Sequence, residues 1–234
     1  MTIRIGTSGW SYDHWNGVLY PSGLPAKDRL SRYVREFDTV ELNASFYRWP
    51  RESTFAKWNA QLPEHFELSV KAHRGLTHFR RLKSPEPWVG RVQLAWEALG
   101  DRPKVLLVQL HPEQQRDDAR LDYFLSCLGS IRVAVELRHP SWDDSAVYAL
   151  LERHGAAYVV TSGAGLPCVL RAPQTRSTYA CTGPTPTRCM RVHTPATICG
   201  GGPSASQNGR SKVATCWCTS TTTDTATRFR THMS

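Results

Sequence analysis

Two glutamates and two basic residues occupy positions where they could carry out acid–base chemistry. Glu41, Lys71 and Glu136 each lie near the end of a short apolar run, and Arg138 follows two residues after Glu136. A positioned carboxylate can act as a general base, and cationic groups can neutralise a phosphate or carboxylate. The sequence therefore suggests Glu41 or Glu136 as the base, with Lys71 and Arg138 binding an anionic substrate.

Other residues at the ends of these runs could bind the substrate through hydrogen bonds, charge or stacking. An alternative of equal weight is that Glu41 and Glu136 simply pair with the basic residues in a buried polar network. Gln109 ends an almost wholly apolar run, so its amide needs a partner, which could be a ligand or a neighbouring side chain. The candidate binding residues are Ser8, Trp10, Asn43, Gln109, Arg138 and His139.

The first loop is rich in aromatic residues. Trp10, Tyr12, His14 and Trp15 follow the first apolar run and could form a stacking wall for a sugar or a base. The alternative is that this loop folds over the neighbouring strand ends and buries its own aromatic rings.

No cofactor is predicted. Glu41, Glu136, His73 and His111 could converge on a divalent metal, but no HxH or HExxH spacing indicates one. The seven cysteines contain no CxxC pair and no histidine at finger-like spacing, so neither a zinc site nor a disulfide framework is indicated.

The elements that must position these residues alternate between strand-like and helix-like runs. Such repeated units predict a parallel sheet covered by helices. No GxGxxG follows the first run, and polar residues end every run, which favours a triosephosphate-isomerase-type α/β barrel over an open doubly wound sheet. Only about six units are present, so the predicted barrel is incomplete. The predicted strands are Ile3–Thr7, Thr39–Ser45, Phe66–Ala72, Lys104–Leu110, Arg132–Leu137 and Ala156–Thr161, and the helices are Pro25–Phe37, Glu52–Ala60, Trp88–Leu99, Asp117–Leu128 and Asp143–His154.

Residues 172–234 differ in composition from residues 1–171. They hold 15 Thr, 5 of the 7 Cys, no Leu and a single acidic residue, Asp224. A segment without apolar periodicity cannot bury one face. We therefore predict a barrel domain at 1–171 followed by a non-native, disordered tail at 172–234.

The net charge is concentrated in the same segment. Residues 172–234 contribute +6 of the formal charge of +9, and residues 1–171 contribute only +3. Bulk charge is therefore no argument for a polyanionic partner. No apolar stretch approaches the roughly 18 residues of a membrane span, and Met1 to Gly6 lacks the apolar core of a secretory signal. A cytoplasmic protein without a membrane partner is expected, and the oligomeric state stays open.

The chain resembles the YecE-like family, known as domain of unknown function 72. This resemblance covers residues 3 to about 165 and implies a triosephosphate-isomerase-type barrel, without implying a reaction. It adds Tyr47 and His78 as candidate binding residues, although such histidines are more often structural. The motifs are Gly6-Thr7-Ser8-Gly9-Trp10-Ser11-Tyr12, Trp15 with Tyr20-Pro21, Val40-Glu41-Leu42-Asn43-Ala44-Ser45-Phe46-Tyr47, Lys71, Thr77-His78, Gln109-Leu110, and Val135-Glu136-Leu137-Arg138-His139 with Trp142.

The family's last two strands carry patterns like Y-V-R-L-H-G and Y-F-N-N-D, which this chain lacks as written. Reading its codons one base earlier forces Leu and Val across Cys216-Trp217-Cys218 and permits Y-F-N-N-D after them. The same shift permits R-L-H-G across Tyr179 to Gly183. We therefore predict a one-base frame change near codons 171 to 174.

Three hypotheses for function follow. The favoured one is a barrel enzyme acting on a phosphorylated or otherwise anionic small molecule, such as a phosphoester hydrolase. The alternative is a non-catalytic module that binds a ligand or nucleic acid through the aromatic first loop and the basic groups. A third is that a barrel lacking two strands exposes the edges of its first and sixth strands, folds poorly and has no activity.

Overall fold

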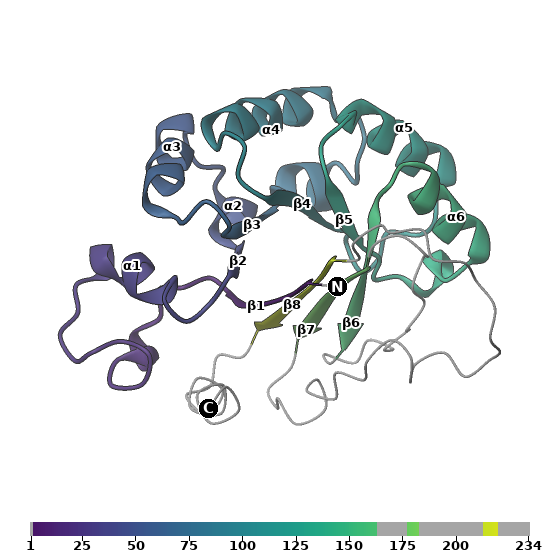
Figure 1. Ribbon diagram of the computed structural model, residues 1–234. Helices are drawn as coiled ribbons and strands as arrows, with labels where there is room; N and C mark the ends of the chain where they lie inside the picture. The colour runs from purple at the N-terminus through teal and green to yellow at the C-terminus, as the bar shows by residue number, and fades with distance from the viewer. Residues whose placement is uncertain (1, 163–176, 183–212, 220–234) are drawn as a thin grey trace, which may run out of the picture.

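The computed structural model describes residues 2–162, 177–182 and 213–219 of the chain. Within them, eight parallel strands form a closed barrel in chain order, and β8 pairs with β1 to complete the ring (Figure 1). The strands are β1 Thr2–Ser8, β2 Thr39–Leu42, β3 Glu67–Lys71, β4 Lys104–Gln109, β5 Val133–Glu136, β6 Ala157–Ser162, β7 Ser177–Thr182 and β8 Val213–Thr219.

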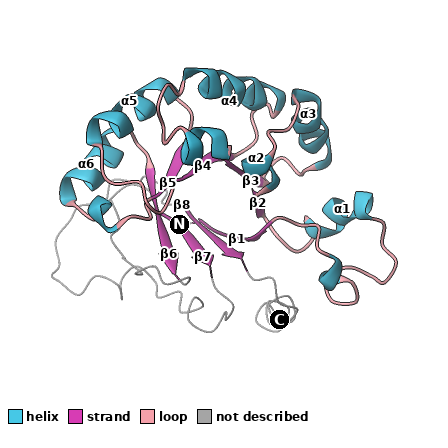
Figure 2. Ribbon diagram, turned by 180° about the vertical axis from the view of Figure 1, so that it is seen from behind, coloured by secondary structure: helices cyan, strands magenta, loops and turns pink. Residues whose placement is uncertain are grey.

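The helices lie on the outside of the strands, and α3 to α6 form an arch around β3 to β6 (Figures 1 and 2). Two of them begin at aspartates that cap their free N–H groups: Asp117 accepts from Arg120 N, and Asp144 accepts from Ala146 N. The α-helices are α1 Arg29–Tyr33, α2 Ala44–Tyr47, α3 Glu52–Gln61, α4 Glu86–Ala98, α5 Asp118–Leu128 and α6 Ser145–Arg153, and the shorter turns are η1 Asp13–Trp15, η2 Ala26–Asp28, η3 Gly75–Phe79 and η4 Pro140–Trp142.

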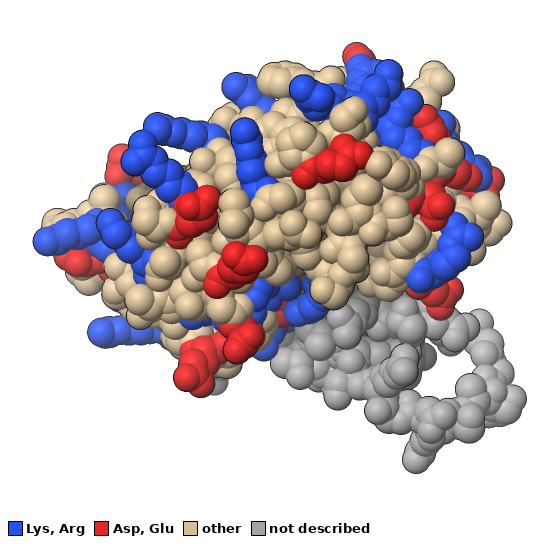
Figure 3. Space-filling model, turned by 90° about the horizontal axis from the view of Figure 1, so that it is seen from above, with Lys and Arg blue, Asp and Glu red and all other residues tan. Residues whose placement is uncertain are grey.

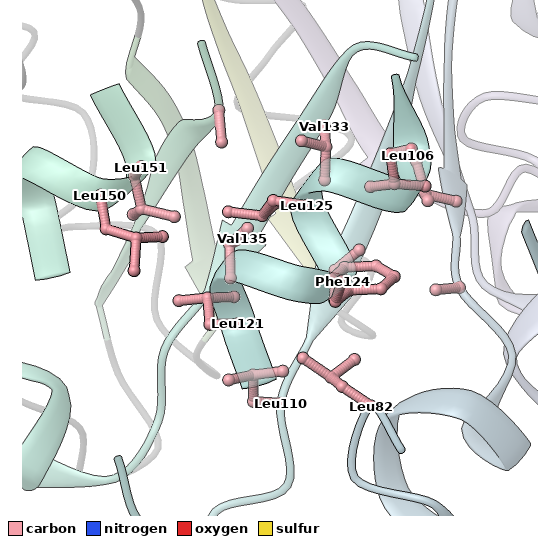
Figure 4. Close-up of a cluster of buried hydrophobic side chains, with 14 of the residues drawn as sticks. Leu82, Leu106, Leu110, Leu121, Phe124, Leu125, Val133, Val135, Leu150 and Leu151 are labelled. Carbon is pink, nitrogen blue, oxygen red and sulfur yellow. The ribbon is translucent and has the colours of Figure 1, made fainter. Parts of the chain in front are cut away.

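The sequence of strand β4 is almost continuously apolar because the strand is buried on both faces. Leu106 and Val108 face outward and pack in the cluster that contains Phe124 of α5 (Figure 4). Val105 and Leu107 point to the opposite side of the strand and form a separate buried cluster with residues of β5 and β6. The strand is therefore buried both against the helices and inside the barrel, as expected for a parallel sheet.

The barrel type and the six predicted strands are confirmed. The structure differs from the predicted incomplete ring because residues 177–182 and 213–219, both within the segment expected to be a disordered tail, form β7 and β8. They pair with β6 and β1, so neither of those strands has a free edge in the described residues. The two strands lie where the shifted reading frame also places strands. The division at residue 171 and the frame change both stay predictions.

Two local elements at the C-terminal ends of the strands were not predicted. The expected strand Thr39–Ser45 ends at Leu42 and is followed by the short helix α2. The hydroxyl of Ser45 lies 2.6 Å from the carbonyl oxygen of Leu42 and 2.7 Å from that of Lys71, which ties α2 to β2 and β3. The second is η3, a π-helical turn directly after β3.

Within the described residues, no helix is both long enough and apolar enough to span a bilayer.

Candidate functional site at the barrel mouth

The strand register places the predicted polar residues on the inner side of the barrel. Ser8 is in register with Glu41, and Gln109 is in register with Glu136. Paired residues of neighbouring parallel strands point to the same face, and the carboxyl ends of all strands meet at one mouth. Residues scattered along the sequence are thereby brought to one end of the barrel.

The first carboxylate, Glu41, is almost fully buried. It accepts a hydrogen bond from Ser8 Oγ at 3.1 Å, and Ser8 Oγ accepts one from Asn43 Nδ2 at 2.8 Å. Lys71 Nζ lies 3.6 Å from Glu41 Oε1, which makes a partly solvent-shielded ion pair. The predicted residues Ser8, Glu41, Asn43 and Lys71 therefore form one connected network.

The second carboxylate, Glu136, is 2% exposed. Gln109 Nε2 lies 2.9 Å from each of its two oxygens and donates to them. Arg138 Nε lies 3.2 Å from Oε1 but makes no hydrogen bond to any described residue, so its interaction with Glu136 is one of charge. Of the two partners considered for the Gln109 amide, a ligand or a neighbouring side chain, the structure shows the side chain of Glu136.

Lys71 couples the two carboxylates. Burial raises the pKa of Glu136 above its ordinary value, and the charge of Lys71 is the largest effect that opposes this rise. The Gln109 hydrogen bond and the charge of Arg138 also lower the pKa, whereas the charge of Glu41 raises it. The net result is that Glu136 holds a proton more readily than it would in water.

The π-helical turn η3 carries His78 to the same mouth. Its ring contacts Phe46 with centroids 4.8 Å apart and His111 with centroids 5.2 Å apart. Burial, followed by the charges of His111, Arg138 and Lys71, together lowers the pKa of His78 to about 4. The imidazole is therefore neutral at physiological pH. π-helical turns often occur at functional sites.

The segment after η3 is held in an unusual backbone conformation. Arg81, Leu82 and Ser84 have φ angles of 47°, 66° and 46°, which lie in the left-handed region that side chains disfavour. Leu82 is 1% exposed and packs in the main core cluster, which anchors the segment. Such strain persists only where the surrounding structure enforces it. The position of η3 over the mouth is therefore fixed by packing.

His139 and Tyr47 lie at the rim. His139 accepts from the backbone N–H of Ser141 and so caps η4. Tyr47 is 62% exposed, Arg74 lies over its ring, and its carbonyl oxygen is 3.2 Å from His73 Nε2. Neither residue is part of the two carboxylate networks, and their predicted binding roles stay predictions.

The aromatic first loop is largely packed against the protein. Trp15 is 3% exposed, and Trp10 packs edge to face on Trp58 of α3. The Tyr20 hydroxyl donates to the Trp10 carbonyl, and the Tyr12 hydroxyl donates to the Ser8 carbonyl. This packing fits the alternative in which the loop buries its own rings. Tyr12 nevertheless reaches the site, because its hydroxyl bonds the backbone of Ser8, and its pKa is raised by burial and then by the charge of Glu41.

Sequence reasoning missed three residues that shape the site: Tyr12 as a neighbour of Glu41, Phe46 and Thr77. Phe46 contacts Lys71, whose Nζ lies 5.4 Å from the ring centroid. Thr77 is fully buried, and its Oγ1 lies 2.9 Å from His78 Nδ1. Phe46 and Thr77 are close in the sequence to the candidates Tyr47 and His78. Their contacts become visible only in the helix α2 and the turn η3.

A divalent metal was the least favoured prediction for this mouth. Among the residues that the structure describes, no three or more His, Cys, Asp and Glu side chains are grouped to hold a metal ion. The polar groups instead form two carboxylate–cation pairs joined by hydrogen bonds. This arrangement can hold a proton and present positive charge to an anion.

Comparisons with known proteins agree with this fold. The chain is 29% identical over 194 residues to the UPF0759 protein YunF of Bacillus subtilis, covering 75% of this chain and 68% of YunF. It is 27% identical over 142 residues to the UPF0759 protein YecE of Escherichia coli, covering 60% of this chain and only half of YecE.

Two crystal structures of DUF72 family proteins are similar in fold. One, from Thermotoga maritima, has a TM-score of 0.75 and is 22% identical in sequence. The alignment covers 100% of this chain and 99% of the Thermotoga chain. Another, from Enterococcus faecalis, has a TM-score of 0.69 and 13% identity, with coverage of 93% and 89%. The sequence profile described as "Protein of unknown function DUF72" matches residues 4–231. Because this match extends over nearly the whole chain, the protein belongs to the DUF72 family.

Proposed function

We propose that the protein is an enzyme that acts on a small phosphorylated or otherwise anionic molecule, most simply as a phosphoester hydrolase. The observation that carries the proposal is the pair of buried carboxylates, Glu41 and Glu136, each with its own cation at one barrel mouth. Folds of this type place their catalytic groups at that end. Fold analogy alone would not assign a reaction.

The two carboxylates are given different roles by their surroundings. Glu136 has the raised pKa, so it is the better candidate to hold and deliver a proton. Glu41, bonded to Ser8 and paired with Lys71, is the candidate general base. Lys71 and Arg138 would neutralise the anionic group of the substrate, because each retains solvent-exposed surface on a side chain that also touches a carboxylate.

The purely structural interpretation remains the direct competitor, since the same pairs could only order the mouth. Phosphate release from a panel of phosphomonoesters and phosphodiesters separates the two. Glu136→Gln should lower kcat/KM by about 100-fold or more. Glu97→Gln, on the exposed face of α4, is the matched control and should leave activity unchanged. Activity that survives Glu136→Gln intact would refute the assigned role.

A second candidate is a binding module without turnover, and one observation at the rim favours it. Arg74 lies 5.7 Å from the ring centroid of Tyr47 and 5.3 Å from that of Phe79, and both rings are mostly exposed. Such a rim could hold a ligand or a nucleic acid by stacking. On the face that Figure 3 shows, acidic and basic residues are interspersed.

Measurements of binding distinguish this module from the enzyme. A module would bind without turnover, its affinity would fall with added salt, and Trp10→Ala would weaken it. Turnover that depends on Glu136 would instead favour the enzyme.

A further inference from the structure

Three histidines near the mouth each make the same type of local hydrogen bond. Each ring accepts, at Nδ1, the backbone N–H of the residue two positions later, with distances of 2.9 to 3.2 Å. An accepting Nδ1 carries no proton, so the hydrogen of the neutral ring must be on Nε2. The three are His73, His111 and His139.

These rings can therefore only donate at their remaining nitrogen. His73 uses Nε2 on the carbonyl oxygen of Tyr47. His111 and His139 have no Nε2 partner among the described residues and present N–H donors. Donors of this kind suit the oxygens of an anion.

His78 has the opposite arrangement. Its Nδ1 lies 2.9 Å from Thr77 Oγ1, which also lies 3.4 Å from the carbonyl oxygen of His73. The Thr77 hydroxyl has one proton, and a carbonyl oxygen can only accept. Both contacts are hydrogen bonds only if Thr77 donates to His73 and His78 Nδ1–H donates to Thr77. The lone pair of His78 then resides on Nε2, which has no partner in the described part of the chain.

We infer that the substrate is a hydroxylated anion, whose hydroxyl donates to His78 Nε2 while its anionic group is bound by Lys71 and Arg138. This inference rests on the proposed function, because it names the substrate class of the same site. His78 is a specificity-determining residue in this assignment, since it provides an acceptor among donors and cations. A site built to hydrogen-bond a hydroxyl strongly rejects the analogue that lacks it.

The packing places the acceptor beside the cations. The ring of Phe46 contacts both Lys71 Nζ and His78, so it spaces the ammonium from the imidazole. The charges of Lys71 and Arg138 both reach His78, which places it within the same field. A single small ligand can therefore contact the cations with one end and His78 with the other.

The test compares two phosphate esters of nearly equal size. Glycerol 3-phosphate carries hydroxyls, and propyl phosphate lacks them; inorganic phosphate reports anion binding alone. Isothermal titration calorimetry on the full chain should show glycerol 3-phosphate binding about tenfold or more tightly than propyl phosphate. His78→Phe should abolish that difference while leaving the affinity for propyl phosphate within about twofold, because the aromatic ring preserves the packing on Phe46.

Thr77 provides an independent variant. Thr77→Val removes the hydroxyl that sets the tautomer and should reduce the preference for glycerol 3-phosphate, whereas Thr77→Ser should retain it. Nitrogen chemical shifts of the wild-type histidines should place the proton of His78 on Nδ1 and that of His111 on Nε2.

The outcomes separate the inference from the proposed function. If inorganic phosphate binds and the two esters bind equally, the hydroxylated substrate is refuted and the anion site stands. If neither phosphate nor either ester binds, the proposed function falls together with the inference. A preference that disappears on adding a chelator would assign the His78 lone pair to a metal and also overturn it.

Discussion

Gln109 Nε2 donates to both carboxylate oxygens of Glu136, at 2.9 Å each, across neighbouring strands β4 and β5. The amide therefore orients the carboxylate but cannot compensate for its burial, because the pKa of Glu136 is still raised. The protonation of Glu136 is therefore sensitive to the charge of a ligand that binds beside it. A bound anion would raise this pKa further, since it opposes the negative form.

The raised pKa predicts a specific pH dependence of stability. Folded Glu136 binds its proton more tightly than the unfolded chain does, so folding takes up a proton just above the unfolded pKa of about 4.3. The free energy of unfolding should therefore lose a contribution from Glu136 as pH rises from that value through the raised pKa. Urea denaturation at several pH values measures this. Glu136→Gln should remove the effect, so the wild-type-minus-variant difference should fall with rising pH; a flat difference would contradict the raised pKa.

Gly6 should tolerate no side chain. A Cβ at this position would lie 2.1 Å from the carbonyl oxygen of Thr39, its register partner on β2. Backbone in a paired strand cannot move away cheaply, so Gly6→Ala should destabilise the fold by about 2 kcal/mol or more. Gly90→Ala is the matched control, because Gly90 is inside α4 with no atom within 4 Å of its Cβ position. That variant should gain about 0.5–1 kcal/mol from helix propensity, and thermal melts of both would test the contrast.

Arg102, a buried residue between α4 and β4, should contribute strongly to the stability of the fold. Its guanidinium donates to Asn59 Oδ1 and to carbonyl oxygens at the end of α3 and the start of β3. Arg102→Lys cannot reproduce this planar set of donors and should cost about 2–4 kcal/mol in the free energy of unfolding. Arg120→Ala, which loses only a partly exposed ion pair with Asp117, should cost less than about 1 kcal/mol. If urea denaturation shows that Arg102→Lys loses as little stability as Arg120→Ala, the hydrogen bonds of Arg102 are dispensable.

Residues 172–234 give a prediction at the level of the gene. Independent sequencing across codons 171 to 174 should reveal a one-base frame change, and the corrected chain should read R-L-H-G near residues 179–183 and Y-F-N-N-D after residue 217. The corrected protein should melt at a higher temperature than the chain described, because apolar strand residues would fill the barrel interior. An unaltered frame in an independent clone would reject this.

The sequence alone placed much of the site. Glu41, Lys71, Gln109 and Glu136 were predicted to meet because each ends an apolar run, and the structure brings them to one mouth. That inference depends only on alternation along a strand and on the parallel direction of all strands. The ion pairs of Glu41 with Lys71 and of Glu136 with Arg138 agree with the predicted pairing.

Local elements at the strand ends were harder to predict. The turn η3 contains a histidine and a buried threonine, but no periodicity marks five residues of π-helix. Its existence depends on tertiary contacts, including Gly75, where a Cβ would lie 2.5 Å from the Trp88 ring. In the reading frame as written, β7 and β8 lack the apolar runs by which the other strands were identified, and only the shifted frame places strands there.

The sequence by itself determined the strand order, the helices of the body and the polar residues that end each strand, because these follow from apolar spacing over short stretches. Only the tertiary structure decided the hydrogen-bond partners of each carboxylate, the closure of the ring, and which nitrogen of each histidine is free. Those features depend on contacts between residues distant in the chain, and their geometry is fixed by strand register and side-chain packing, which no local pattern records.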